Sequence, residues 1–130
     1  MIRLPKSERK KTGKLGEQLA LDYLLGLNTV ETWHIEHQNW RCRTGELDIV
    51  AREANVLVFI EVRTRHDGGK FGEAAESVDA RKQRQVMRTA LYYISLYGLH
   101  DIPLRFDVIA VTLGADDHLQ QLQHYRNAFS

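Results

Sequence analysis

Residues 45–64 have the sequence GELDIVAREANVLVFIEVRT. Successive side chains of a β-strand point to opposite faces, and on this pattern we predict two strands, over residues 46–52 and 56–64. The first strand has one face with Leu47, Ile49 and Ala51 and another with Glu46, Asp48 and Val50. The second has one face with Val56, Val58, Ile60 and Val62 and another with Leu57, Phe59, Glu61 and Arg63. Residues 53–55 have the length of a hairpin connection, which predicts that the two strands pair antiparallel.

The residues before this hairpin predict a helix and a strand. Apolar side chains recur every three or four positions over residues 14–27, which is typical of an amphipathic helix. Residues 30–38 mix aromatic, β-branched and polar types and predict a strand. Residues 39–45 then predict a turn or hairpin.

The residues after the hairpin predict a loop over 66–69, a long helix and further strands. The helix begins at residue 74 or 78 and ends at residue 97, before Gly98. Its buried stripe contains Val78, Val86, Ala90, Tyr93, Ile94 and Tyr97. Residues 106–111 are apolar on both faces, as in an interior strand, and residues 115–130 form a short edge strand or a terminal turn. This order predicts an α/β fold in which helices flank a mixed sheet of four to five strands.

The composition is that of a single globular domain. The chain has 130 residues, of which 43% are hydrophobic and 27% charged, and this length allows a core of its own. The single cysteine cannot form an internal disulfide. Because no apolar run could span a bilayer and no signal peptide is visible, we expect a cytoplasmic protein without a membrane partner. We expect a flexible basic arm over residues 1–13 and one domain over residues 14–130.

Positive charge is concentrated in two segments. Residues 1–14 contain six basic side chains and one acidic one, and residues 81–88 contain four basic side chains and no acidic one. Arg81, Arg84 and Arg88 recur at steps of three and four, so on a helix they form one ridge. Such segments either contact nucleic-acid phosphates or are solvated surface.

Asp48 and Glu61 interrupt strands that are otherwise apolar. Burying a carboxylate without compensation is costly, and the hairpin register brings Asp48 beside Glu61, where the two repel each other unless a cation lies between them. Oxygen ligands of this kind suit Mg²⁺ or Mn²⁺. The alternative is structural ion pairing, of Glu61 with Arg63 or Arg65 and of Asp48 with Arg43 or Lys82. Asp107, in the later apolar strand, is expected to pair with Arg105 or another cation.

Several short motifs in one order resemble a known family. They are Gly16-Glu17, Asn39-Trp40-Arg41, GELDIV (45–50), FIEV (59–62), Phe71-Gly72, Val78 with Lys82, and RFDV (105–108). Together they resemble the YraN family of small bacterial proteins, over residues 13 to about 113. That family is similar to the PD-(D/E)XK nuclease superfamily, particularly to archaeal Holliday-junction resolvases. The resemblance implies a restriction-endonuclease-like core, a four-stranded mixed sheet flanked by helices.

The resemblance also implies roles for individual residues. Asp48 matches the metal-binding aspartate and Glu61 the acidic residue of the (D/E)XK strand. Glu17 matches an acid on the first helix; the alternative is a first-turn glutamate favoured by the helix dipole. Arg63 stands where the superfamily has lysine, and arginine can stabilise negative charge but cannot act as a base. Lys82 is either a replacement for that lysine or a solvated helix cation.

The implied function is that of an endonuclease that uses Mg²⁺ or Mn²⁺ to cleave branched or single-stranded DNA. The alternatives are a nucleic-acid-binding module that keeps the fold without catalysis, and an adaptor for a protein partner. Arg41, Arg43 and Arg65, expected on loops beside the site, join the ridge of Arg81, Arg84 and Arg88 as candidate phosphate contacts. Trp33 and Trp40 either stack on bases or belong to the core. A homodimer is expected by analogy alone.

Overall fold

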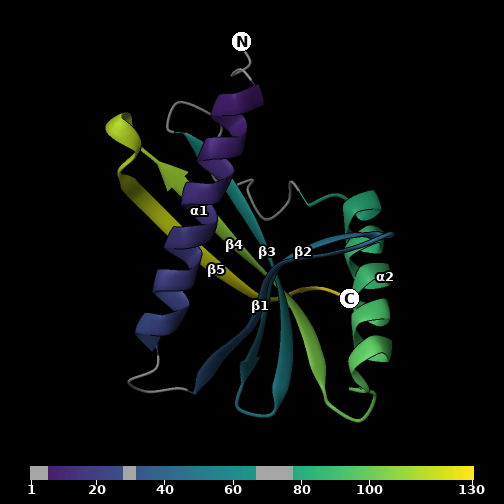
Figure 1. Cartoon of the computed structure of the whole chain (residues 1–130). Coiled ribbons are helices and arrows are strands. Elements are labelled where there is room, and N and C mark those ends of the chain that lie inside the picture. The colour runs from purple at the N-terminus through teal and green to yellow at the C-terminus, as the bar shows by residue number, and fades with distance from the viewer. Residues whose placement is uncertain (1–5, 28–31, 67–77) are drawn as a thin grey trace.

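Helices cover both faces of one mixed sheet. The computed structural model describes residues 6–27, 32–66 and 78–130. The elements in these ranges are α1 (Lys6–Gly26), β1 (Trp33–Cys42), β2 (Gly45–Glu53), β3 (Val56–His66), α2 (Ala80–Tyr97), β4 (Leu104–Leu113), the 3₁₀ turn η2 (Ala115–Asp117) and β5 (Leu119–Phe129). Figure 1 shows α1 and α2 on opposite sides of the sheet. The predicted α/β class is confirmed, and the architecture is consistent with a restriction-endonuclease-like core.

The strands lie in the order β1-β2-β3-β4-β5. The hairpins β1–β2 and β2–β3 are antiparallel, β3 and β4 are parallel, and β4 and β5 are antiparallel. Only Ala54 and Asn55 separate β2 from β3, so the predicted antiparallel hairpin is confirmed. β4 lies between β3 and β5, which explains why its sequence is apolar on both faces.

Each face of the sheet packs against one helix. The α1 face contains Ala20, Leu21, Leu24, Trp33, Ile49, Ala51, Val58, Ile60, Ile109, Val111 and Leu113. The α2 face contains Leu47, Val50, Leu57, Phe59, Val78, Val86, Ala90, Tyr93, Ile94, Phe106, Val108 and Phe129. The two predicted faces of β3 are confirmed, because Val58 and Ile60 lie in the first cluster and Leu57 and Phe59 in the second.

The predicted faces of β2 are wrong at Leu47. This residue packs with Val50 on the α2 face, whereas Ile49 and Ala51 lie on the α1 face. The pairing of β2 with β3 begins only at Ile49. Before that residue, the β1–β2 hairpin leaves the sheet and extends toward α2, as Figure 1 shows. The bend carries Leu47 across to the other helix.

Three element boundaries differ from the prediction. α1 begins at Lys6, so residues 6–13 are helical and the predicted arm is wrong there, while residues 1–5 lie outside the described residues. β1 continues to Cys42, which reduces the predicted turn over 39–45 to residues 43–44. β5 is a long edge strand of 11 residues. The loop predicted over residues 66–69 is wrong at residue 66, because His66 is the last residue of β3. Residues 67–69, the helix start at residue 74 and the Phe71-Gly72 motif lie outside the described residues.

Residues at both ends of α2 explain where the helix begins and ends. The carboxylate of Asp79 accepts the backbone N–H of Lys82 at 2.8 Å and caps the helix. Gly98 has a φ of 67° and ends it. The predicted buried stripe is correct from Val86 to Ile94. Val78 is buried but precedes the helix, and Tyr97 is 45% exposed. No helix in the described ranges is long and apolar enough to span a membrane.

Candidate functional site

Asp48 and Glu61 converge where β2 and β3 separate. The register that pairs Ile49 with Ile60 places Asp48 opposite Glu61 on the neighbouring strand. Backbone pairing stops here, and Oδ2 of Asp48 instead accepts the N–H of Val62 at 2.9 Å. Glu61 is only 5% exposed. The two acids therefore meet as the hairpin register predicts.

Burial and mutual repulsion act on both carboxylates. Burial, followed by the negative charge of Asp48, raises the pKa of Glu61 to about 7. Burial likewise raises the pKa of Asp48, although the Val62 N–H and the positive charges of Lys82 and Arg63 lower it. Because the pKa values stay raised, the cations nearby do not compensate for the loss of water around the two carboxylates.

Lys82 reaches this pair from the first turn of α2. Its Nζ lies 3.4 Å from Oε1 of Glu61, and its side chain is 34% exposed. The alternative of a solvated helix cation is therefore wrong. The alternative of structural ion pairing placed either Arg43 or Lys82 with Asp48, whereas the observed ion pair joins Lys82 to Glu61.

Arg63 lies two residues after Glu61 on β3 and shares its face of the strand. Its charge lowers the pKa of both Asp48 and Glu61, so the guanidinium acts on the acid pair. Because arginine keeps its proton at every accessible pH, it can stabilise negative charge here but cannot accept a proton.

Glu17 on α1 adds a third acid. Burial raises the pKa of Glu17 to about 7, with contributions from the charges of Asp48 and Glu46, while a hydrogen bond from the Asn39 side chain lowers it. The alternative of a first-turn glutamate is wrong, because α1 begins at Lys6 and Glu17 lies near its middle.

Gly16 explains how α1 brings Glu17 so close to the sheet. A Cβ atom at this position would lie 1.8 Å from Oγ1 of Thr64 on β3. No side chain larger than hydrogen fits, so the helix backbone packs directly on β3. Thr64 is only three residues beyond Glu61 along the same strand, which places Glu17 at the acid pair.

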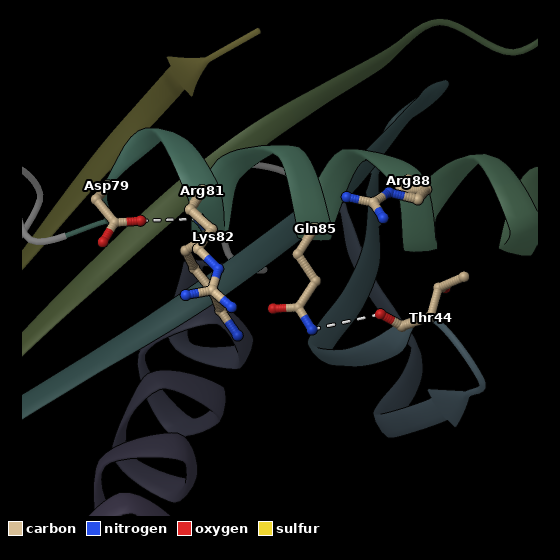
Figure 2. A pocket seen from close by; sticks show the side chains of 6 residues that line it. All are labelled: Thr44, Asp79, Arg81, Lys82, Gln85 and Arg88. Atoms are coloured by element: carbon tan, nitrogen blue, oxygen red, sulfur yellow. Dashed lines mark hydrogen bonds between the residues drawn. The ribbon is translucent and has the colours of Figure 1, made fainter.

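Two clefts open beside the β1–β2 hairpin. The first, which we call the α1 cleft, has a volume of about 430 Å³ and is lined by Lys10, Gly13, Lys14, Glu17, Asn39, Arg41 and Glu46. The second, the α2 cleft, has a volume of about 420 Å³ and is lined by Thr44, Asp79, Arg81, Lys82, Gln85 and Arg88 (Figure 2). Glu17 in the first acts on Asp48, and Lys82 in the second contacts Glu61. Each cleft is therefore lined by one residue that interacts with the acid pair, although neither acid of the pair lines a cleft itself.

The basic ridge of α2 lies along the α2 cleft. Arg81 and Arg88 line the cleft, and Arg84 is exposed on the same helix. The turn between β1 and β2 closes the cleft opposite the helix, because Nε2 of Gln85 donates to the carbonyl oxygen of Thr44 at 3.3 Å. The α2 cleft is therefore lined by cations of the helix on one side and by Thr44 of the hairpin turn on the other.

The other predicted arginines lie around the hairpin and on β3. Arg43 is exposed in the turn between β1 and β2. Arg41 lies on β1 and Arg65 on β3, so their predicted placement on loops is wrong. Nη2 of Arg41 is 3.6 Å from Oε2 of Glu46 in the α1 cleft.

Some polar residues that line the two clefts have no pattern in the sequence that predicts such a role. Asn39 has a φ of 50° and hydrogen-bonds to Glu17, but only its place in the Asn-Trp-Arg motif drew attention to it. Lys10 falls within the predicted arm, yet it lies on α1 and lines a cleft. Thr44 and Gln85 carry no sequence signal, because their contact depends on the bend of the hairpin.

The donor set at the acid pair fits a divalent cation that keeps water or phosphate ligands. Among the described residues, no three acidic, histidine or cysteine side chains form a group that could hold a metal ion on its own. Mg²⁺ needs fewer, since it is usually bound by one or two carboxylates together with waters and substrate phosphates. Asp48 and Glu61 supply two carboxylates, and burial raises the pKa of both.

Comparison with known proteins gives one consistent family. The model of the uncharacterised protein family UPF0102 matches residues 16–111. A UPF0102 protein of Geobacter sulfurreducens is 42% identical over 120 residues, which are 92% of this chain and 89% of the relative. A UPF0102 protein of Porphyromonas gingivalis is 39% identical over 123 residues, 95% of this chain and 87% of the relative. Another, of Symbiobacterium thermophilum, is 39% identical over 120 residues, 92% of this chain and 97% of the relative. The chain therefore belongs to the uncharacterised protein family UPF0102, the YraN family that its motifs resemble.

Proposed function

We propose that this protein is a nuclease that uses Mg²⁺ or Mn²⁺ to cleave phosphodiester bonds of DNA. The observation that supports it best is the acid pair, in which the buried Glu61 and the half-buried Asp48 face each other from neighbouring strands while a lysine contacts one of them. The similarity of the family's motifs to the PD-(D/E)XK superfamily points the same way.

Each residue of the site has a distinct part in this proposal. Asp48 and Glu61 would hold the metal ion, which when bound activates a water ligand and neutralises charge on the phosphate. Lys82 stabilises negative charge on the phosphate oxygens from the α2 side, and Arg63 does so from β3. Glu17 orients water molecules at the edge of the site from α1.

A second candidate is a module that binds nucleic acid without cleaving it. The observation that favours this candidate is Arg63, because the superfamily has lysine at this position and arginine cannot serve as a base. The same clefts and cations would then bind the nucleic acid, and the acid pair would at most hold a structural ion.

Calorimetric titration with Mn²⁺ tests the metal site. We expect binding to the wild-type protein and none to Asp48→Asn or Glu61→Gln, with all three folded by circular dichroism. Asp22→Asn is the matched control, since Asp22 is exposed on α1, and this variant should bind as the wild type does. Unchanged binding to both site variants would remove the metal proposal.

Cleavage of linear, flapped and four-way DNA with Mg²⁺ or Mn²⁺ separates the two candidates. The nuclease proposal requires cleavage by the wild type that Asp48→Asn abolishes. Binding without cleavage by the wild type would favour the second candidate. Arg63→Lys then asks whether the arginine limits turnover: faster cleavage supports that view, and an unchanged rate contradicts it.

A further inference from the structure

The outer side of α2 changes character along its length. Its first half exposes Arg81, Arg84 and Arg88. Its second half exposes large apolar side chains, namely Leu91 (65%), Tyr92 (51%), Leu96 (57%) and Tyr97 (45%). Arg88 and Tyr92 are four residues apart and therefore neighbours on the helix surface. A cationic segment thus passes directly into an aromatic one.

The edge strand β1 extends this aromatic segment. The ring of Trp40 lies 6.2 Å from that of Tyr92 and 6.4 Å from that of Tyr97, and its indole N–H donates to the Tyr97 hydroxyl at 3.3 Å. Trp40 is only partly buried against the α2-side core. Trp33, by contrast, is 1% exposed and belongs to the core. Of the two tryptophans, only Trp40 is placed to meet a ligand.

The cationic and aromatic segments form one continuous strip. Thr44, in the turn after β1, meets α2 at Gln85 and Thr89 and lines the α2 cleft. Four residues earlier on β1, Trp40 meets α2 near Tyr92. Figure 2 shows the cationic end, where Arg81 and Lys82 extend from α2 into the cleft. From Arg81 to Tyr97 the helix rises about 24 Å, which matches roughly seven nucleotides of a stacked strand at 3.4 Å each.

We propose that this strip, from Arg81 and Lys82 to Trp40, Tyr92 and Tyr97, binds single-stranded nucleic acid, with phosphates on the cations and bases stacked on the aromatic rings. The role of such binding rests on the proposed function: Lys82 of the strip contacts Glu61, so a strand bound along the strip would lead to the acid pair.

Charge and chemistry favour a single strand over other occupants. Cations that follow a backbone beside aromatic rings are the usual means of binding unpaired bases, whereas the bases of a duplex are stacked on each other. The acids beside the strip are already engaged, and one of them, Glu61, pairs with Lys82 of the strip itself at 3.4 Å. Asp79 caps α2, and Glu36 on β1 accepts from Nε of Arg52 at 2.9 Å. They leave the strip with a positive surface, which suits phosphates better than an apolar protein face.

Tryptophan fluorescence tests the strip with the full chain in EDTA, so that neither metal nor cleavage is needed. A 15-nucleotide oligo(dT) should quench the emission of Trp40, and Trp40→Phe should abolish the quenching while Trp33 continues to emit. Tyr92→Ala should weaken binding by at least about fivefold, the lower end for loss of one base stack. Arg88→Ala should weaken it and reduce its salt dependence.

Matched controls separate the strip from general effects. Lys11→Ala and Leu25→Ala remove an exposed cation and an exposed apolar side chain from α1, and both should bind oligo(dT) as the wild type does. Circular dichroism confirms that each variant is folded. Duplex DNA of equal length should bind more weakly and without quenching.

Three results would overturn the inference. The first is equal quenching in Trp40→Phe and the wild type, and the second is tighter binding to duplex DNA than to oligo(dT). The third is a wild-type dimer in gel filtration that Tyr92→Ala converts to a monomer, because the aromatic segment would then be an interface between copies of this chain. Failure of the strip is distinguishable from failure of the nuclease. Oligo(dT) binding in EDTA tests the strip alone, whereas Mn²⁺ binding and DNA cleavage test the nuclease, so either proposal can fail without the other.

Discussion

Replacing Gly16 with alanine is expected to separate α1 from the sheet. The added Cβ atom would lie 1.8 Å from Oγ1, 2.8 Å from Cβ and 2.9 Å from Cγ2 of Thr64. Rotation of the Thr64 side chain relieves only the first and third overlaps, because its Cβ atom is fixed to the backbone of β3. The helix itself must therefore shift. Overpacking of this kind destabilises a protein by about 1–3 kcal/mol.

Gly13 provides a control in the same helix. A Cβ atom at Gly13 would meet nothing within 4 Å, so alanine there gains the usual helix preference over glycine, about 0.5–1 kcal/mol. The same chemical change three residues apart should therefore have opposite signs. Gly16→Ala gains the same helix preference, which cancels in the comparison, so the two variants should differ in unfolding free energy by roughly 1–3 kcal/mol, the cost of the overlap with Thr64.

Thermal unfolding followed by circular dichroism measures the difference. One kcal/mol corresponds to about 4 °C in Tm for a domain of this size, so Gly13→Ala should melt above the wild type and Gly16→Ala several degrees below it. Adding Thr64→Ala to Gly16→Ala should recover part of the loss, because it removes two of the three overlapping atoms. If both alanine variants raise Tm equally, α1 does not pack directly on β3, and the explanation for the position of Glu17 fails.

Two further predictions concern backbone strain and acid stability. Ala54 has a φ of 53° in the exposed β2–β3 turn, so Ala54→Gly should stabilise the protein by about 0.5–1 kcal/mol, whereas Ala128→Gly on β5 should destabilise it in the same urea titration. Burial favours a higher pKa for Asp107, but hydrogen bonds from His124 and Arg105 lower the pKa overall. The ionised carboxylate therefore stabilises the folded protein fully above the unfolded pKa of about 3.9. This stabilisation is lost as the pH falls through the lower pKa of the folded state. Asp107→Asn should therefore be less stable by about 3 kcal/mol at pH 7, with a smaller gap at pH 3; an equal gap at both values would contradict this reasoning.

Alternation within one strand was enough to predict half of the site. Residues 56–62 are apolar apart from Glu61, so the alternating pattern fixes the face of Glu61, and the short connection to β2 fixes the register that brings Asp48 opposite to it. These are local properties of a tight hairpin. The same pattern failed at Leu47 because it assumes a flat strand, whereas the bend of the β1–β2 hairpin depends on contacts with α2 that are distant in sequence.

The first helix shows a different limit of pattern analysis. Residues 6–14 have the sequence KSERKKTGK, which has no apolar periodicity and therefore predicts no buried face. Lysine, arginine and glutamate nevertheless favour helix, and extending a helix that is already formed is easy. The position of Glu17 beside Asp48 was equally hidden from periodicity, because it depends on the close contact of Gly16 with Thr64.

The strongest argument that Asp48 and Glu61 are functional comes from a comparison with Asp107 on β4. All three acids lie in the interior of one sheet. Asp107 is fully buried and fully satisfied: it accepts hydrogen bonds from Arg105 at 2.9 Å, His124 at 2.8 Å and the Asn127 N–H at 2.9 Å, and its pKa is lowered. This is what a structural ion pair requires. Asp48 and Glu61 instead face each other, and their pKa values are raised. This contrast between one fully paired acid and two acids that face each other supports the proposed cation site at Asp48 and Glu61 over a second structural network.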